Sequence, residues 1–237
     1  METIRKSQER GKVDFGWLKS FHSFSFGHYY DPKWMGFQNL RVINDDLVAG
    51  ENGFDFHPHK NMEIITFMLQ GELTHQDSMG NKEVIRRGDI QVMTAGTCVM
   101  HSEWNYGKEA TKLLQIWILP NAMELKPRYE QINFQDKFQT EQFTLVAGTK
   151  ENMPIKLNAD ANLYHMNLKN DESLNFKSEE KGIYLHVYQG SLKVNDTEIK
   201  AGDALMIDQL GLKNLTFQST TEKTQALLFE LNSPLFT

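Results

Sequence analysis

The sequence predicts an all-β protein made of two jelly-roll barrels, and two observations carry that prediction. From Leu40 onward, short apolar runs alternate with Gly-containing turns at nearly regular spacing, as in β-sandwiches and β-barrels. The second half of the chain then repeats several of these runs and turns in the same order. None of the runs that follow Leu40 in the first half shows convincing helical periodicity, so we expect helices to contribute little to the fold.

The first barrel is outlined by short strands and tight turns. The run over residues 63–69 is rich in β-branched and aromatic side chains, and Gln70-Gly71 ends it. Residues 79–81, Met-Gly-Asn, predict a hairpin turn, and residues 87–89, Arg-Gly-Asp, predict another before the run over residues 90–93.

The first forty residues are rich in aromatic residues, Gly and His. Residues 21–26 alternate in part between Phe and polar residues, which predicts a strand that the Asp-Pro turn at residues 31–32 ends. His22 and His28 lie in this stretch, but neither belongs to a closely spaced pair of potential ligands. We interpret both as structural or surface histidines, with a place in a site as the alternative.

An internal repeat relates the two halves of the chain. Residues 182–190 resemble residues 63–71, and both segments end in Gln-Gly. The Gly-Asp pair at residues 202–203 corresponds in the same way to the pair at residues 88–89. Recurrence in the same order indicates a duplicated structural unit, so we expect two related β-barrels in one chain.

Composition and charge exclude several classes of function. The net charge is −6 without a compensating basic run, so the chain lacks the clustered Lys and Arg that bind nucleic acid. Cys98 is the only cysteine, which rules out an internal disulfide, and we expect this thiol to be buried and inert. The N-terminus lacks the apolar core of a signal peptide, and no stretch is apolar enough to span a bilayer. We therefore expect a soluble, cytoplasmic protein without a membrane partner.

Two short motifs have the spacing of a metal site. One residue separates His57 from His59, and one residue separates His101 from Glu103. Because successive side chains of a strand point to opposite faces, each pair would face one side of its strand, and two such strands could bring four ligands together. The alternative is that His57 and His59 lie on the surface beside a turn at Pro58. The presence of two such pairs favours a metal site.

The donor set restricts which metal can bind. Imidazole nitrogen and carboxylate oxygen suit borderline divalent ions, and the lack of a thiolate argues against a purely structural site. We expect one divalent transition metal, with Fe(II) as the first choice and Ni, Co, Mn, Cu or Zn as alternatives. Four protein ligands leave coordination positions open on an octahedral ion, where a substrate or dioxygen can bind.

The second barrel lacks these motifs. No His-x-His pair precedes Gly182, and no histidine follows Asp203. We therefore expect an N-terminal metal-binding domain over residues 1–125 and a C-terminal domain without a metal over residues 143–237. The polar, charged segment over residues 126–142 is expected to be the linker.

These motifs resemble those of known families. The spacing from His57 to Gly71 resembles the first cupin motif, and the spacing from Gly88 to Asn105 resembles the second. More closely, residues 57–63, 93–97 and 101–103 resemble the pirin family, and residues 25–32, 41–46 and 127–131 look like its bacterial branch associated with quercetinase activity. The resemblance implies a bicupin with a metal only in the N-terminal barrel.

The resemblance also bears on which glutamate completes the site. Cupins in general use the Glu of the first motif, here Glu63, whose even spacing from His59 keeps it on the same strand face. In pirins the ligand is the Glu two residues after the third His, here Glu103. Because the pirin match is closer, we expect Glu103 to be the ligand and Glu63 to orient a ligand histidine. Glu63 as a direct ligand is the alternative.

The function implied by the resemblance is that of a metal-dependent quercetin 2,3-dioxygenase. In the expected reaction Glu103 takes the proton of the 3-hydroxyl of a flavonol such as quercetin, dioxygen attacks the heterocycle, and carbon monoxide leaves. We expect Phe56, Phe67 and Met93 to line a dry interior, an aromatic substrate and dioxygen as partners, and a monomer. One alternative is a metal-dependent redox-sensing or regulatory protein that binds other proteins, and another is a different cupin reaction in the same pocket.

Overall fold

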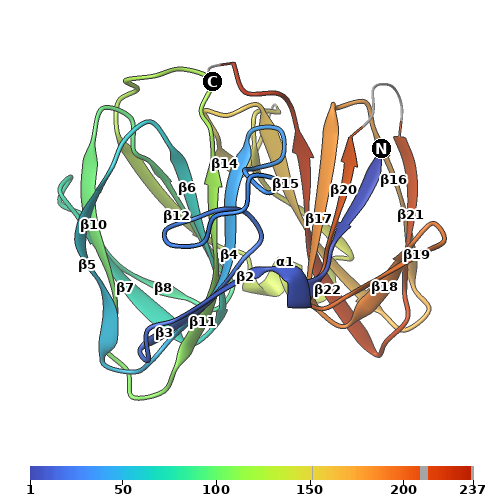
Figure 1. Cartoon of the computed structure of the whole chain (residues 1–237), viewed down its shortest axis with the longest axis horizontal. Coiled ribbons are helices and arrows are strands. Elements are labelled where there is room, and N and C mark those ends of the chain that lie inside the picture. Colours follow the sequence, from blue (N-terminus) through green and yellow to red (C-terminus); the bar gives the residue numbers. More distant parts are fainter. Residues whose placement is uncertain (151, 209–212, 236–237) are drawn as a thin grey trace. The chain divides into compact units, whose positions relative to one another are not determined.

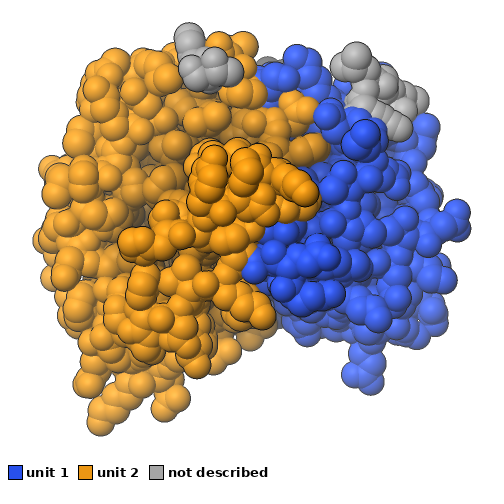
Figure 2. Space-filling view, in the orientation of Figure 1, with its two compact units in different colours: residues 1–10, 136–156, 160–233 blue, residues 11–135, 157–159, 234–237 orange. Residues whose placement is uncertain are grey.

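The computed structural model describes residues 1–150, 152–208 and 213–235. Contacts divide the chain into two compact units, which Figure 2 shows in different colours. Unit 1 comprises residues 1–10, 136–156 and 160–233, and unit 2 comprises residues 11–135, 157–159 and 234–237. Among the described residues, no helix has both the length and the apolar character that a membrane span requires.

Unit 2 consists of two antiparallel sheets (Figure 1). Its strands are β2 (Gly11–Asp14), β3 (Leu18–His22), β4 (Leu40–Val48), β5 (Asn52–His59), β6 (Glu63–Gln70), β7 (Glu72–Asp77), β8 (Lys82–Arg86), β9 (Asp89–Thr94), β10 (Val99–Asn105), β11 (Thr111–Ile118) and β12 (Arg128–Asn133). The larger sheet has the order β12-β9-β6-β11-β4-β3-β2, and the smaller one has the order β5-β10-β7-β8. The strand predicted over residues 21–26 is shorter than expected, because β3 ends at His22.

Unit 1 repeats this plan. Its elements are β1 (Glu2–Arg5), the short 3-10 helix η1 (Ser7–Glu9), α1 (Gln135–Thr140), β13 (Phe143–Gly148), β14 (Ile155–Lys156), β15 (Ala161–Lys169), β16 (Ser173–Ser178), β17 (Gly182–Gln189), β18 (Ser191–Val194), β19 (Thr197–Lys200), β20 (Ala204–Asp208), β21 (Lys213–Ser219) and β22 (Lys223–Leu231). The larger sheet has the order β1-β20-β17-β22-β15-β13-β14, and the smaller one has the order β16-β21-β18-β19.

The backbone supports the predicted duplication. Gly71 follows β6 with φ 75°, and Gly190 follows β17 with φ 76°. The Gly-Asp turns before β9 and β20 also match, since Gly88 has φ 87° and Gly202 has φ 86°. Glycine adopts such left-handed conformations without the steric penalty that other residues incur. The predicted all-β fold of two cupin barrels is confirmed.

The strands of the two sheets of unit 2 differ in which of their side chains are buried. β6 and β9 are buried over nearly their whole length, as their almost continuous apolar sequences require. In β10 burial alternates, so that His101, Glu103 and Asn105 face the interior while the residues between them are more exposed. The smaller sheet therefore turns polar side chains inward.

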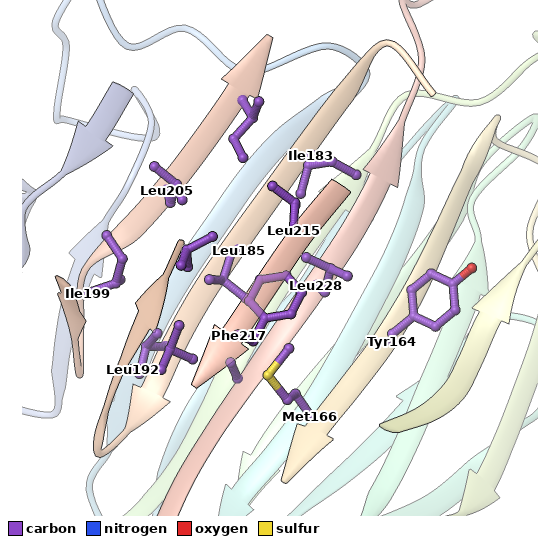
Figure 3. Packing of buried hydrophobic residues seen from close by; sticks show 14 of the residues in the cluster. Tyr164, Met166, Ile183, Leu185, Leu192, Ile199, Leu205, Leu215, Phe217 and Leu228 are labelled. Carbon is purple, nitrogen blue, oxygen red and sulfur yellow. The ribbon is translucent and has the colours of Figure 1, made fainter. Parts of the chain in front are cut away.

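The interior of unit 1 is an apolar core. Figure 3 shows that Leu185, Phe217 and Leu228 point toward one another between the strands, with Met166 beside them. All four side chains are buried. Full burial of a side chain of this size stabilises the fold by about 1.5–3 kcal/mol, so this cluster contributes strongly to the stability of unit 1.

Residues 126–142, expected to be a linker, are structured. β12 extends the larger sheet of unit 2 by pairing with β9, and β1 extends that of unit 1 by pairing with β20. Both added strands cover a sheet edge whose backbone groups would otherwise lack partners. The two compact units therefore have other bounds than the domains expected over residues 1–125 and 143–237, and that division stays a prediction.

Candidate metal centre

The two predicted ligand pairs lie on adjacent strands. β5 pairs antiparallel with β10, and His57 lies opposite His101. A β-bulge follows, so that Glu103 lies opposite Phe54 rather than Asp55. A bulge changes the face to which the following side chains point. Residues an odd number of positions apart point to opposite faces of a regular strand. The bulge explains how Phe54 and His57, three residues apart, can both face the interior.

Three imidazole rings converge at this place. The Nε2 atoms of His57 and His101 are 3.0 Å apart. The ring centroids of His57 and His59 are 4.7 Å apart, and those of His59 and His101 are 4.8 Å apart. One donor nitrogen from each ring lies within 4.8 Å of the other two. The structure thus brings the three predicted histidines together.

Glu103 is buried beside this cluster, and two side chains hold its carboxylate. The hydroxyl of Thr66 donates to Oε1 at 3.1 Å, and the amide of Gln115 donates to Oε2 at 2.9 Å. A carboxylate oxygen of Glu103 also lies within 4.8 Å of donor atoms of His101 and His75. Glu103 therefore adjoins the cluster through His101.

His75 supports His101 from the other side, and sequence reasoning missed it. Nδ1 of His101 lies 3.3 Å from Nδ1 of His75, and Nε2 of His75 lies 3.0 Å from Oδ2 of Asp77. These contacts are satisfied when His101 carries its proton on Nδ1 and His75 carries its proton on Nε2, which leaves Nε2 of His101 available to a metal. The His-x-Asp spacing on β7 is the signal that could have identified His75.

The electrostatics of the cluster favour the neutral forms of His59 and His101. Burial, reinforced by the neighbouring histidines, lowers the pKa of His59 to about 3 and that of His101 to about 3. Both rings are therefore neutral at physiological pH. Neutral imidazole is the form that binds a metal, so His59 and His101 can bind an ion without a cost of deprotonation.

Glu63, the alternative ligand, belongs to neither group of potential ligands. It is buried at the start of β6, and its Oε2 accepts a hydrogen bond from the backbone N–H of Asn158 at 3.2 Å. Burial raises the pKa of its carboxyl group. This contact orients a backbone segment rather than a ligand histidine, which differs from the role we expected.

Cys98 is exposed, contrary to the expectation of a buried thiol. It lies between the turn at residues 96–97 and the start of β10. Among the residues expected to line the interior, Phe56 is also exposed, whereas Met93 packs in an apolar cluster with Ile64 and Val99.

The residues present fit a borderline divalent transition metal. Three imidazole nitrogens lie together, and the carboxylate of Glu103 adjoins them through His101. This donor set, without a thiolate, suits ions such as Fe(II) and Ni(II) and leaves positions open. Two barrels in one chain, with this donor set in the barrel of unit 2, define the class of protein as a bicupin with a candidate metal site.

Family models agree with this description. The Pirin model matches residues 3–118, and the model of the quercetinase C-terminal cupin domain matches residues 144–231. The chain belongs to the pirin family.

Individual relatives cover nearly the whole chain. The quercetin 2,3-dioxygenase of Escherichia coli (strain K12) is 41% identical over 230 residues, which cover 96% of this chain and 97% of the relative. A Pirin-like protein of Caulobacter vibrioides is 37% identical over 211 residues, 87% of this chain and 90% of the relative. The crystal structure of bacterial pirin YhhW in complex with nickel(II) from Escherichia coli has a TM-score of 0.91 at 38% identity and covers 98% of this chain and 100% of that chain. The predicted family and the quercetin 2,3-dioxygenase-like enzyme class are confirmed.

Proposed function

We propose that this protein is a metal-dependent dioxygenase that opens the heterocyclic ring of flavonols such as quercetin and releases carbon monoxide. The observation that carries the proposal is the convergence of His57, His59 and His101 beside the carboxylate of Glu103 inside one barrel. A relative named quercetin 2,3-dioxygenase supports the substrate class. We propose Fe(II) as the native ion, and the nickel(II) complex of a related protein supports an ion of this series.

In this proposal His57, His59, His101 and Glu103 are the metal ligands. A bound divalent ion would polarise the hydroxyl oxygen of the substrate and so lower the pKa of that hydroxyl. Glu103 would take the proton. Its oxygens are held by Gln115 and by the hydroxyl of Thr66, and a hydroxyl can turn from donor to acceptor when the carboxylate gains a proton. Glu103 can therefore change protonation state without leaving its place.

The test combines metal analysis with quercetin consumption, measured in air and without oxygen. The variants are His101→Ala and Glu103→Gln, and the matched control is Glu109→Gln, whose side chain is exposed. We expect His101→Ala to lose both metal and activity. Glu103→Gln should lower the rate by at least about 100-fold, because a positioned base contributes on the order of 10²–10⁴. Glu109→Gln should behave as the wild type.

Oxygen-dependent loss of quercetin that both site variants abolish would support the enzyme and its ligands together. Stoichiometric metal with no turnover, for each of the divalent ions Fe, Ni, Co, Mn, Cu and Zn, would overturn the flavonol dioxygenase. In that case the regulatory alternative, in which the metal acts through protein partners, would take its place.

A further inference from the structure

A cavity of about 150 Å³ lies in unit 2. Its walls are apolar and include Val13, Leu18, Phe26 and Phe54. A cavity of this size holds one six-membered aromatic ring. The residues expected from the sequence, Phe56, Phe67 and Met93, are not among its lining residues.

The floor of the cavity is polar and buried. It is formed by Ser20 on β3 and by Asn44 and Asp46 on β4. The hydroxyl of Ser20 donates a hydrogen bond to the carboxyl group of Asp46. The side-chain oxygen of Asn44 is buried and has no hydrogen-bond partner among the described residues. A few polar groups at the end of an apolar pocket are the arrangement that orients a ligand with matching polar groups.

Asp46 can both donate and accept a hydrogen bond near neutral pH. Burial raises the pKa of its carboxyl group to about 7, and the negative charges of Asp45 and Glu103 add to this effect. A carboxyl group in its protonated form donates through O–H, whereas the ionised form only accepts. A phenolic hydroxyl, which also donates and accepts, matches either form.

Two routes connect the cavity with the metal cluster. Asn44 lies opposite Gln115 on β11, and the amide of Gln115 donates to Glu103. On another side, the ring of Phe26 lies 5.1 Å from that of Trp117, which lies 4.8 Å from the ring of His59. Each route passes through two side chains, one that lines the cavity and one that contacts a proposed ligand.

The mouth of the cavity is at the surface. Phe15 is 53% exposed, and His28 is exposed as well. Their rings approach edge to face, with centroids 6.2 Å apart. The floor is buried while the rim is open, so a ring can enter between these two side chains and reach the polar groups. His28 therefore belongs to the rim of this cavity, and His22 is one of its buried lining residues.

We infer that this cavity binds a hydroxylated six-membered aromatic ring and that Asp46 and Asn44 select for its hydroxyl groups. The inference rests on the proposed function and deepens it. The ring would be the phenyl group attached to the heterocycle of a flavonol. The chain would then discriminate among flavonols by the hydroxyl groups of that ring.

The experiment measures equilibrium binding of flavonols with two, one or no hydroxyl groups on this ring, by fluorescence and without oxygen, to the metal-loaded full chain. All three probes carry the same 3-hydroxyl end, so differences report the cavity. We expect the dissociation constant to rise about tenfold from two hydroxyls to none. Asp46→Leu should reduce this ratio to less than about twofold, and Asp46→Asn, which keeps an acceptor and a donor, should keep part of it. Glu109→Gln, at an exposed position that does not line the cavity, should leave the ratio unchanged.

A second variant tests the place of binding. Val13→Phe adds a ring to the cavity wall and should weaken binding of all three flavonols by at least about tenfold while metal content stays the same. An unchanged ratio in Asp46→Leu, or unchanged affinities in Val13→Phe, would overturn the inference.

The inference and the proposed function fail separately. Quercetin turnover in air with no preference for ring hydroxyls would retain the dioxygenase and reject the cavity. Hydroxyl-dependent binding that needs Asp46, without any turnover, would retain the cavity and reject the dioxygenase.

Discussion

The two barrels share a hydrogen-bonding plan and differ in what fills them. In unit 2 a row of polar side chains crosses β4, β11, β6 and β9, formed by Asn44, Gln115, Thr66 and Gln91. In unit 1 the corresponding strands β15, β22, β17 and β20 carry, at the same register, Tyr164, Leu228, Leu185 and Leu205. Polar side chains therefore fill this row in unit 2, whereas apolar and aromatic side chains fill it in unit 1.

The ligand positions show the same replacement. His75 lies four residues after Gly71 and pairs with Glu103. Val194 lies four residues after Gly190 and pairs with Phe217. Phe217 therefore stands where unit 2 has Glu103. By the same pairing, the positions of His101, His57 and His59 are occupied in unit 1 by Leu215, Phe176 and Ser178. Unit 1 keeps the strands of a metal-binding barrel without the donors.

The comparison teaches that strand pairing does not decide whether a jelly roll holds a site. Both barrels pair their strands in a corresponding order, and because those pairs use backbone groups, the side chains of the interior can be polar or apolar at little cost to the sheets. The polar interior does have a cost in stability, because buried polar groups need partners, and both side-chain polar atoms of Gln91 have none among the described residues. Exchanging residues at matched positions tests this reading.

The largest effect is expected from truncating the core of unit 1. Phe217→Ala should lower the free energy of unfolding by about 3–5 kcal/mol, the usual cost of removing a buried aromatic ring. Metal content should not change. Glu103→Ala, at the matched position, should instead lower metal content and activity with a smaller loss of stability. Denaturant titration and metal analysis of both variants check this, and metal loss in Phe217→Ala would contradict the separation of roles.

Asp46 should make stability depend on pH, whereas unit 1 has Met166 at the matched position. Its pKa is raised from 3.8 to about 7 in the folded state, so folding binds a proton between these values. The stability that protonation confers is complete below pH 3.8 and is lost as the pH rises through 7. Asp46→Asn can still accept a hydrogen bond from Ser20, so it should raise the Tm more at pH 8 than at pH 5. The gain in the free energy of unfolding at pH 8 should be at most about 4 kcal/mol. An equal gain at both pH values would argue against the raised pKa.

His75 should matter for the metal, unlike Val194 at the matched position. His75→Val removes the partner that fixes the tautomer of His101, and loss of such a partner weakens metal binding about 10–100-fold. Competition with a chelator of known affinity measures the change. Val194→Ala serves as the control and should leave the metal affinity unchanged. An unchanged metal affinity in His75→Val would show that His101 does not need the contact with His75.

The smallest effect is expected from removing an unsatisfied amide. Gln91→Leu copies Leu205 of the matched position and should raise the free energy of unfolding by about 1–2 kcal/mol, because a buried polar group without a partner is costly. The reverse exchange, Leu205→Gln, should lower it. Thermal unfolding of both variants gives the result, and a loss of stability in Gln91→Leu would indicate that the amide has a partner in solution.

Much of the site could be predicted from local spacing. The pairs His57 and His59, and His101 and Glu103, were visible because alternation along a strand is a property of the strand itself. The bulge that aligns Phe54 with the interior was not visible, because it depends on how β5 pairs with β10. The choice between Glu103 and Glu63 drew on resemblance, since both have a spacing that places them on a ligand face.

Other features depended on contacts between distant residues. Thr66 and Gln115 hold Glu103 across 37 and 12 positions of the chain, and no local pattern marks them. The cavity combines residues of β2 to β5, so the expected lining residues near the motif were not the ones that form it. β12 was taken for a linker because its polar sequence resembles a loop, whereas the free edge of β9 gives it a partner.

The sequence alone determined the class of fold, the duplication and the positions of the three proposed histidine ligands, while the choice of Glu103 as the fourth drew on the family resemblance. The fold, the duplication and the histidine pattern follow from periodicity, turn residues and the order of motifs, which act over a few residues at a time. The tertiary structure decided what surrounds the ligands, namely the support of His101 by His75, the hydrogen bonds that hold Glu103, and the cavity with Asp46 at its floor. Burial and the convergence of side chains from separate strands create these properties, and neither exists until the sheets have closed around them.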